Sequence, residues 1–270
     1  YAMERFLERL SASKYRNCFI LKGGMLISAM VGIDSRATMD IDTTLRNYPL
    51  NCESAEQIVR QIADVEIDDK ISFVIKKTEE IMEDSEYQGV RLSLDAYLDK
   101  TRIPLKIDIS TGDVITPCEI SFSYQLMFEN RTIPLLAYPP ETVLAEKLET
   151  ILSRGEANTR LRDFYDVYIL QREDFVVTPD ALCHALLATC RKRGHEDLLH
   201  TYASILNEVR QSGAMRTQWM KYQSDFDYAA GITWDTVLDT VETLCMKTLD
   251  DHAFGDELPQ EESQFEMHLL

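Results

Sequence analysis

The sequence predicts an α+β fold, in which a small mixed β-sheet with its helices is followed by a helical C-terminal domain. Residues 38–110 contain β-rich segments with alternating apolar residues, as expected of half-buried strands. After a proline- and turn-rich stretch over residues 111–140, the apolar spacing becomes almost entirely helical. We therefore expect a sheet domain over 1–138, a helical domain over 139–250 and an acidic tail over 251–270 that is mobile or loosely packed.

The elements of the first domain follow from the period of the apolar residues. Residues 2–16 place Phe6, Leu7 and Leu10 on one stripe and predict an amphipathic helix. A short apolar segment over 19–21 and a buried helix over 25–31 come next. Gly32 ends that helix, since glycine is common after helix C-termini. The further elements are expected at 38–45 (strand), 52–65 (helix capped by Asn51), and 71–77, 90–97 and 103–110 (strands).

The second domain is expected to contain at least five helices. A first one opens near Pro140 and stops at Gly155. The others are expected at 159–170, 180–193, 197–211 and 234–249. The basic run 191–193 is interpreted as a complement to the helix dipole rather than as an RNA contact.

The stretch 19–45 carries the clearest chemical pattern. Asp40 and Asp42 lie two residues apart on an expected strand, so their carboxylates share a face and repel each other unless a cation lies between them. Mg²⁺ prefers one or two carboxylates together with substrate phosphates. Gly23 and Gly24 precede a helix whose first N–H groups favour an anion. The pattern predicts the metal and phosphate half of a nucleotidyltransferase site.

Two later segments could complete that site. Asp108 shares a strand face with Lys106 and would add a third carboxylate if its strand neighbours that of Asp40; otherwise it is an edge-strand residue. Asp163 and Asp166 lie on one side of a helix. They belong to a helical hairpin that also carries the basic residues Lys147, Arg154, Arg160 and Arg162. These charged side chains either pair with one another on a solvent-exposed face or form a site that binds phosphates.

Composition limits the partners. The net charge of −18 argues against a protein that coats long duplexes, although a local basic pocket could still bind one RNA end. Six scattered cysteines without a CxxC pair favour reduced thiols and a cytoplasmic location. No run approaches the roughly 18 apolar residues of a membrane span, and the charged first residues do not suggest a signal peptide.

Five segments in order make the chain resemble the AbiEii/AbiGii toxin family of nucleotidyltransferases, the toxin halves of bacterial abortive-infection toxin–antitoxin modules. The segments are LKGG (21–24), RATMDID (36–42), LKIDIS (105–110), ETVLAEKLETILSRG (141–155) and RLRDFYDVYIL (160–170). The resemblance runs from about residue 3 to about residue 195. The family belongs to the DNA-polymerase-beta-like nucleotidyltransferases. The usual glycine-serine pair of that superfamily is here Gly23-Gly24, with a longer interval to the aspartates.

The resemblance implies a nucleotidyltransferase core, an NTP substrate, Mg²⁺, a cognate antitoxin whose direct binding is open, and no membrane partner. In related toxins the acceptor is the 3′ end of tRNA. The implied metal ligands are Asp40, Asp42 and Asp108, and the implied catalytic residues add Lys147, Asp163 and Asp166. The implied nucleotide-binding residues are Lys22, Gly23, Gly24, Arg36 and Lys147.

Several alternatives stay open at this point. Asp108 is a general base or a metal ligand, and Lys147 would stabilise charge on the phosphate oxygens. Arg36 is either a second such cation or an ion pair that holds the loop before Asp40. The chain could instead nucleotidylate a small molecule or a protein, or could bind an NTP without catalysis.

Overall fold

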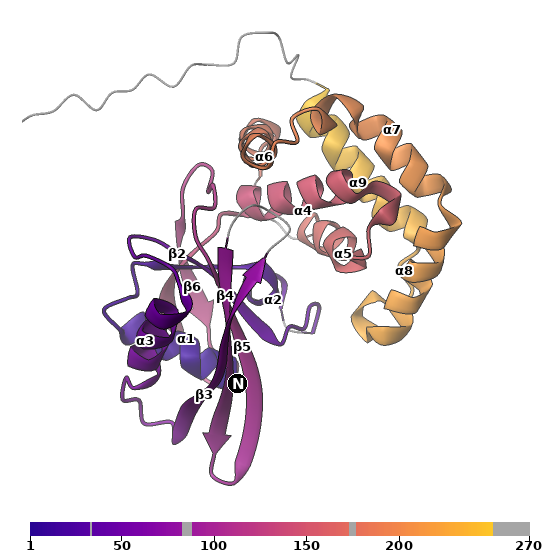
Figure 1. Ribbon diagram of the computed structural model, residues 1–270. Coiled ribbons are helices and arrows are strands. Elements are labelled where there is room, and N and C mark those ends of the chain that lie inside the picture. The colour runs from indigo at the N-terminus through magenta and orange to yellow at the C-terminus, as the bar shows by residue number, and fades with distance from the viewer. Residues whose placement is uncertain (33, 83–87, 173–176, 251–270) are drawn as a thin grey trace, which may run out of the picture.

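The computed structural model describes residues 1–32, 34–82, 88–172 and 177–250, and the predicted acidic tail lies outside the described residues. A mixed seven-stranded sheet forms the first part, and helices stand at one end of it (Figure 1). The α+β prediction is therefore confirmed. Among the described helices, none is long and apolar enough to cross a membrane.

The sheet has the strand order β3-β4-β5-β2-β1-β7-β6. β2 pairs in parallel with β5, and β1 pairs in parallel with β7, while the other neighbours are antiparallel. The strands are β1 Phe19–Lys22, β2 Asp40–Leu45, β3 Ile71–Met82, β4 Gln88–Leu98, β5 Thr101–Ser110, β6 Ile120–Gln125 and β7 Thr132–Ala137.

The last two strands correct the sequence analysis, which treated residues 111–140 as a turn-rich connection. Ile133, Leu135 and Ala137 alternate into the core as a strand requires. Pro134 is tolerated because β7 pairs with β1 only at Leu136 and Ala137, so at the proline the strand has one neighbour instead of two. The proline thus hid a strand that lies next to the edge strand β6.

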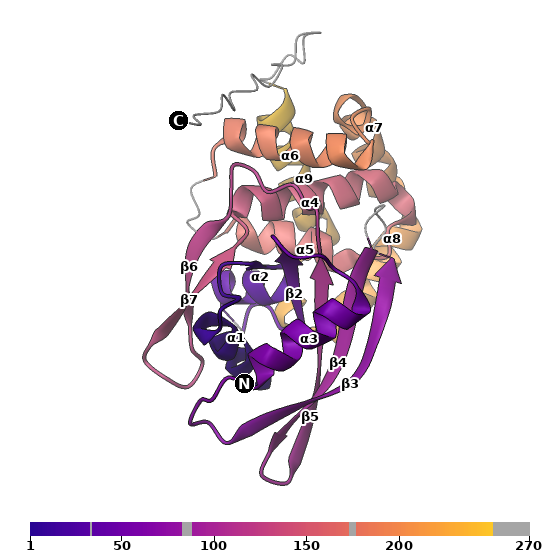
Figure 2. The same ribbon diagram turned by 60° about the vertical axis from the view of Figure 1, so that its left-hand side comes forward.

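Three helices accompany the sheet: α1 Ala2–Ala12, α2 Gly23–Val31 and α3 Cys52–Ala63. α1 and α3 lie on one face of the sheet (Figure 2), whereas α2 packs on β1 and β2 and reaches α5. The predicted Asn51 cap is present, since its side chain accepts a hydrogen bond from the Ser54 N–H at 2.8 Å. α1 is four residues shorter than expected, ending at Ala12 rather than residue 16.

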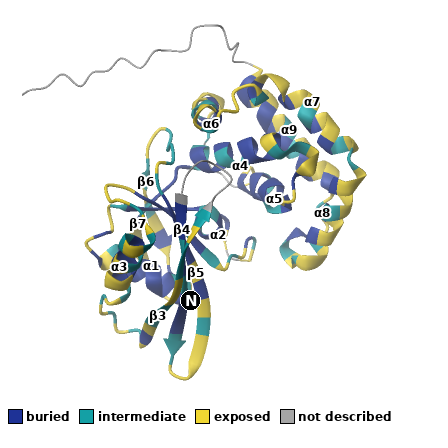
Figure 3. Cartoon of the chain, viewed as in Figure 1, coloured by how far each residue is buried: buried dark blue, intermediate teal, exposed yellow. Residues whose placement is uncertain are grey.

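The helical part comprises α4 Pro140–Arg154, α5 Leu161–Leu170, α6 Pro179–Arg193, α7 Leu198–Gln211, α8 Gly213–Asp225 and α9 Trp234–Leu249. α4 contacts α5, α6 and α7, and its residues are largely buried (Figure 3). The sequence analysis missed α8. Its buried residues Met215, Trp219 and Tyr222 follow a helical spacing, which was the available signal.

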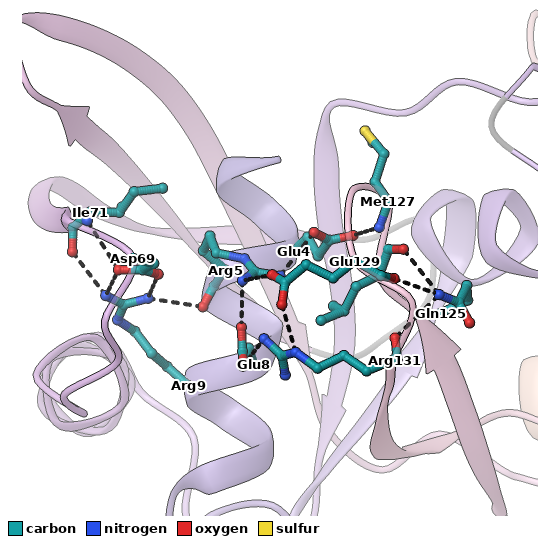
Figure 4. A network of polar contacts seen from close by, with 11 residues as sticks. Glu4, Arg5, Glu8, Arg9, Asp69, Ile71, Gln125, Met127, Glu129 and Arg131 are labelled. Atoms are coloured by element: carbon teal, nitrogen blue, oxygen red, sulfur yellow. Dashed lines mark hydrogen bonds and ion pairs between the residues drawn. The ribbon is translucent and has the colours of Figure 1, made fainter.

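A network of charged side chains fastens α1 to the sheet (Figure 4). Arg9 donates to both carboxylate oxygens of Asp69, at 2.5 and 2.8 Å, and to the Ile71 carbonyl at 2.8 Å. Arg5 pairs with Glu4 and with Glu129 of the β6–β7 turn. The side chains of Arg9 and Asp69 are only 4% and 3% exposed, so each depends on the other for its counter-charge.

Asp69→Ala is expected to lower the free energy of unfolding by about 3–5 kcal/mol, because Arg9 would stay buried without a counter-charge. Urea denaturation of the two proteins measures the difference. Asp68→Ala removes the exposed neighbouring carboxylate and should change stability by no more than about 0.5 kcal/mol.

The same loss should depend on pH. Burial raises the pKa of the Asp69 carboxyl, but hydrogen bonds from Arg9 and the Ile71 N–H outweigh burial and hold it below the ordinary value of 3.8. The ionised carboxylate therefore stabilises the fold above that value, and this stabilisation disappears as the pH falls through the lowered pKa. The deficit of Asp69→Ala should be constant near neutral pH and shrink below about pH 4; a deficit undiminished in acid would contradict this account.

Candidate functional site

Three carboxylates meet on one face of the central strands. β2 and β5 run in parallel with Asp42 opposite Asp108 and Asp40 opposite Lys106. Asp40 and Asp42 share a face because side chains alternate along a strand, and Asp108 stands in the same row as Asp42. The sequence analysis expected Asp108 to join the site only if its strand neighbours that of Asp40. The structure meets this condition, because Asp108 lies on the central strand β5 beside β2 and not at a sheet edge.

The glycine pair makes room for this row. Gly23 has a φ of 62°, and a Cβ atom there would stand 2.2 Å from the Asp42 Oδ2. A Cβ at Gly24 would meet Thr38 at 2.7 Å and Arg36 at 3.0 Å. The Gly24 N–H also donates to the Asp42 Oδ2 at 3.3 Å. One amide at the start of α2 is thus turned toward a carboxylate of the protein itself.

Burial raises the pKa of the Asp42 carboxyl, and the nearby Asp108 raises it further, while Lys22 and the Gly24 N–H oppose the shift. Burial and the charge of Asp108 thus both disfavour the ionised form of Asp42. A cation bound beside Asp42 would favour that form.

Arg91 is a site residue that the sequence analysis missed. It lies on β4 directly opposite Asp108. Its Nε and Nη2 donate to the two carboxylate oxygens of Asp108 at 2.8 and 2.6 Å. This bidentate hydrogen bonding to Asp108 raises the pKa of Arg91, although burial opposes the effect. No local signal could have revealed the pair, because it exists only in the register of β4 against β5.

The acidic row fits a divalent cation in its chemistry, since oxygen ligands from carboxylates are what Mg²⁺ prefers. The donor set is Asp40, Asp42 and Asp108. Within the described ranges, however, no group of three or more acidic, histidine or cysteine side chains is arranged to hold a metal. Because both carboxylate oxygens of Asp108 accept hydrogen bonds from Arg91, Asp108 does not converge with Asp40 and Asp42.

A second charged cluster joins the sheet to the helical part. Arg36, from the loop before β2, donates from Nε to the Asp166 Oδ1 of α5 at 2.7 Å. Lys147 of α4 lies 2.5 Å from Asp163 and 3.2 Å from Asp166. Arg36 and Asp166 are 2% and 0% exposed, so the pair is a buried link between the two parts of the chain. Of the two interpretations of Arg36, the structure displays the ion pair.

The two aspartates of α5 have unequal surroundings. Asp166 binds both Arg36 and Lys147, whereas the Asp163 Oδ2 is buried without a hydrogen-bond partner among the described residues. Burial lowers the pKa of Lys147, but the charges of Asp163 and Asp166 outweigh it, so the net shift is upward and the amine stays protonated.

Lys22 lies on β1 directly opposite Asp42, in the same row across the sheet. Its Nζ donates to the Ser110 Oγ at 2.8 Å and to Asp113 at 2.9 Å. Burial raises the pKa of Asp113, but Lys22 and the hydroxyls of Ser110 and Thr44 lower it, to about 2 overall. The amine therefore has a structural counter-charge in addition to its place in the cavity wall.

One cavity of about 1420 Å³ lies between the sheet and the helices, and Asp40, Asp42, Asp108 and Lys147 are among the residues that line it. Its walls hold 11 of the chain's 28 lysines and arginines, against 7 of its 46 acidic residues. The basic residues are Lys22, Arg36, Arg91, Lys147, Arg154, Arg160, Arg162, Arg191, Lys192, Arg193 and Lys221.

The C-terminus of α6 contributes three of these cations, so the interpretation of residues 191–193 as only a dipole complement is incomplete. Arg193 forms a close ion pair with the buried Glu149 of α4, which also hydrogen bonds the His195 Nδ1 at 2.7 Å. Glu149 thereby holds Arg193 at the cavity wall. The sheet side of the cavity, with the loop before β2, carries three carboxylates and three cations, whereas the helical side carries eight cations and four carboxylates.

Comparisons with known proteins agree with the sequence resemblance. The family model described as "Nucleotidyl transferase AbiEii toxin, Type IV TA system" matches residues 5–240, beyond the expected limit near residue 195. None of the curated proteins compared with the chain matches it. Two solved Helicobacter pylori structures are similar. A candidate nucleotidyltransferase has 14% identity and a TM-score of 0.49, covering 93% of this chain and 94% of its own. JHP933 has 15% identity and a TM-score of 0.48, with 92% and 91% covered.

Gly23→Ala is expected to destabilise the protein more than Gly32→Ala. Both glycines have positive φ values, 62° and 92°, so a side chain strains the backbone at either position. The added Cβ overlaps Asp42 only at Gly23, because no atom of the described residues lies within 4 Å of a Cβ at Gly32. We expect a loss of about 1 kcal/mol for Gly32→Ala and at least about twice that for Gly23→Ala, measured by urea unfolding. Equal losses would mean that Asp42 moves aside freely.

Proposed function

The chain belongs to the nucleotidyl transferase AbiEii toxin family of type IV toxin–antitoxin systems, and we propose that this protein uses an NTP and Mg²⁺ to nucleotidylate the 3′ end of a tRNA. The observation that carries this proposal is the division of one cavity. Carboxylates on β2 and β5 face a helical wall rich in lysine and arginine. The first side suits a divalent cation and the second suits phosphates.

On the sheet side, Asp40, Asp42 and Asp108 would hold the divalent ion, which supplies neutralisation of charge on the triphosphate. Asp108 is also the candidate base for the proton of the acceptor hydroxyl. It could take either role only with an oxygen that is not committed to Arg91. In the reaction, the acceptor oxygen bonds to the α-phosphorus and pyrophosphate leaves.

On the helical side, Lys147 is the candidate for stabilising charge on the phosphate oxygens. Asp163 and Asp166 fix its amine from one side and keep it charged. Both aspartates act on Lys147 as positioning residues. Lys22, Gly23 and Gly24 lie at the start of α2, where N–H groups and the helix dipole favour the triphosphate.

The acceptor is proposed to be RNA because of the cavity rim. Arg154, Arg160, Arg191, Lys192 and Lys221 extend the basic wall from α4 to α8. The protein as a whole has a net charge of −18, so this local concentration of cations is unlike its remaining surface. Cations that release counterions from a nucleic-acid backbone would be effective here.

The family assignment implies a cognate antitoxin, and direct contact with it is no part of the proposal. We place the protein in the cytoplasm, where tRNA and NTPs are present, and its six cysteines, all unpaired thiols, suit a reducing compartment.

Asp40→Asn and Asp42→Asn should each reduce transfer of labelled nucleotide to RNA at least about a hundredfold, since each removes a negative charge from the proposed metal site. The assay combines the protein with Mg²⁺, total tRNA and each labelled NTP in turn. Asp64→Asn, at the exposed end of α3, is the matched control and should leave transfer unchanged. Equal labelling by all variants would refute the assignment of these carboxylates, and label on protein or a small product would replace the RNA acceptor.

Arg191→Ala combined with Lys221→Ala should weaken tRNA binding and lower its salt dependence. Each lost phosphate contact reduces the slope of log K against log salt by about 0.7 to 1. The control combines Lys70→Ala and Lys100→Ala, which remove the same charge from exposed positions outside the cavity. Filter binding over a range of salt concentrations measures both slopes. Similar slopes for the two double variants would place the RNA elsewhere.

A further inference from the structure

Arg91 forms a direct ion pair with one carboxylate of the acidic row. It engages both oxygens of Asp108, and its side chain is 35% exposed whereas that of Asp108 is 11% exposed. The carboxylate is therefore held in place by a guanidinium that reaches solvent. An arginine with that much exposure can leave without crossing a packed core.

Asp108 cannot serve Arg91 and a divalent cation in the same way at once. A Mg²⁺ ligand oxygen lies about 2.0–2.1 Å from the metal, which would bring the ion close to the guanidinium on the same carboxylate. The two cations repel each other at such a separation. Occupation of Asp108 by the metal and bidentate pairing with Arg91 are therefore competing states of one side chain.

The strand register supplies Arg91 with a second partner. Glu79 on β3 stands directly opposite Arg91 on the side away from Asp108. Its side chain is 38% exposed and pairs with Lys77 at 2.6 Å. Arg91 thus lies between two carboxylates on neighbouring strands, and a small swing of its side chain would exchange one for the other.

We propose that Arg91 is a displaceable counter-ion of the metal site, which holds Asp108 in the unloaded protein and moves away when a divalent cation binds. The proposal rests on the assignment of Asp108 as a metal ligand in the proposed function. Arg91 is then a positioning residue that lowers the affinity of the empty site for free metal. The arrangement explains why the three carboxylates occupy adjacent positions without forming a converged set of ligands among the described residues.

The test measures binding of Mn²⁺, without nucleotide, by electron paramagnetic resonance and calorimetry. Arg91→Met removes the competing cation and should tighten binding about tenfold, the equivalent of one charge-assisted hydrogen-bonded pair. Arg91→Lys keeps the charge but loses the bidentate geometry, so it should give a smaller gain. Thermal unfolding confirms that each variant is folded.

Lys106→Met is the matched control. Lys106 lies opposite Asp40 and on the same strand face as Asp108, so its loss changes the local charge as much as the loss of Arg91. Among the described residues no ion pair or hydrogen bond joins Lys106 to the three carboxylates, and its replacement should tighten Mn²⁺ binding far less. The double variant Arg91→Met with Asp108→Asn should bind no better than Asp108→Asn alone, because Arg91 acts through that carboxylate.

The outcomes separate the two proposals. Mn²⁺ binding that weakens in Asp108→Asn but is the same in Arg91→Met and Lys106→Met keeps the metal site and overturns the role of Arg91. Binding that is insensitive to Asp108→Asn overturns both, since Asp108 would then not be a ligand. A gain in Arg91→Met that persists in the double variant shows a general charge effect and also overturns the proposal.

Discussion

The parallel pairing of β2 with β5 is the constraint on which the site depends. It sets Asp42 opposite Asp108 with Asp40 two residues away, so that three carboxylates share one face at the wall of a cavity. Like charges this close raise the free energy of the folded chain unless cations or N–H groups answer them. Arg91 donates hydrogen bonds to Asp108, and the Gly24 N–H donates one to Asp42.

The second constraint is that the cavity needs two walls, which come from distant parts of the sequence. The buried Arg36–Asp166 pair joins the loop before β2 to α5, and Lys147 shares Asp166 with Arg36. Separating the two partners of a buried pair would leave an uncompensated charge. The pair therefore fixes the position of the helical wall relative to the acidic row. Residues at the boundary between the two parts therefore serve the fold and the site together.

The sequence was sufficient for the fold class and for placing the three aspartates on strands, because alternation identified β2 and β5, and the order of motifs identified the family. It was insufficient where the determinant is a contact between distant residues. In the sequence, Arg91 is an ordinary polar residue between the apolar Val90 and Leu92. Its role is visible only from the pairing of β4 with β5. The strand β7 was missed for another reason, since Pro134 carries a local signal against a strand that only the pairing with one neighbour overrides.

The distribution of charge bears on an apparent conflict between an acidic protein and the polyanionic substrate that we propose for it. Net charge governs long-range attraction, and at −18 it opposes the approach of nucleic acid. Salt screens exposed charges beyond about 8–10 Å, so the charges of the cavity wall dominate once a ligand is inside. The acidic remainder of the chain would then disfavour non-specific binding along duplexes, while the cations of the cavity would attract a phosphate-bearing end. Under the proposed function, this charge pattern would favour the terminus of a nucleic acid over its length, as the proposed addition of nucleotides to a 3′ hydroxyl requires.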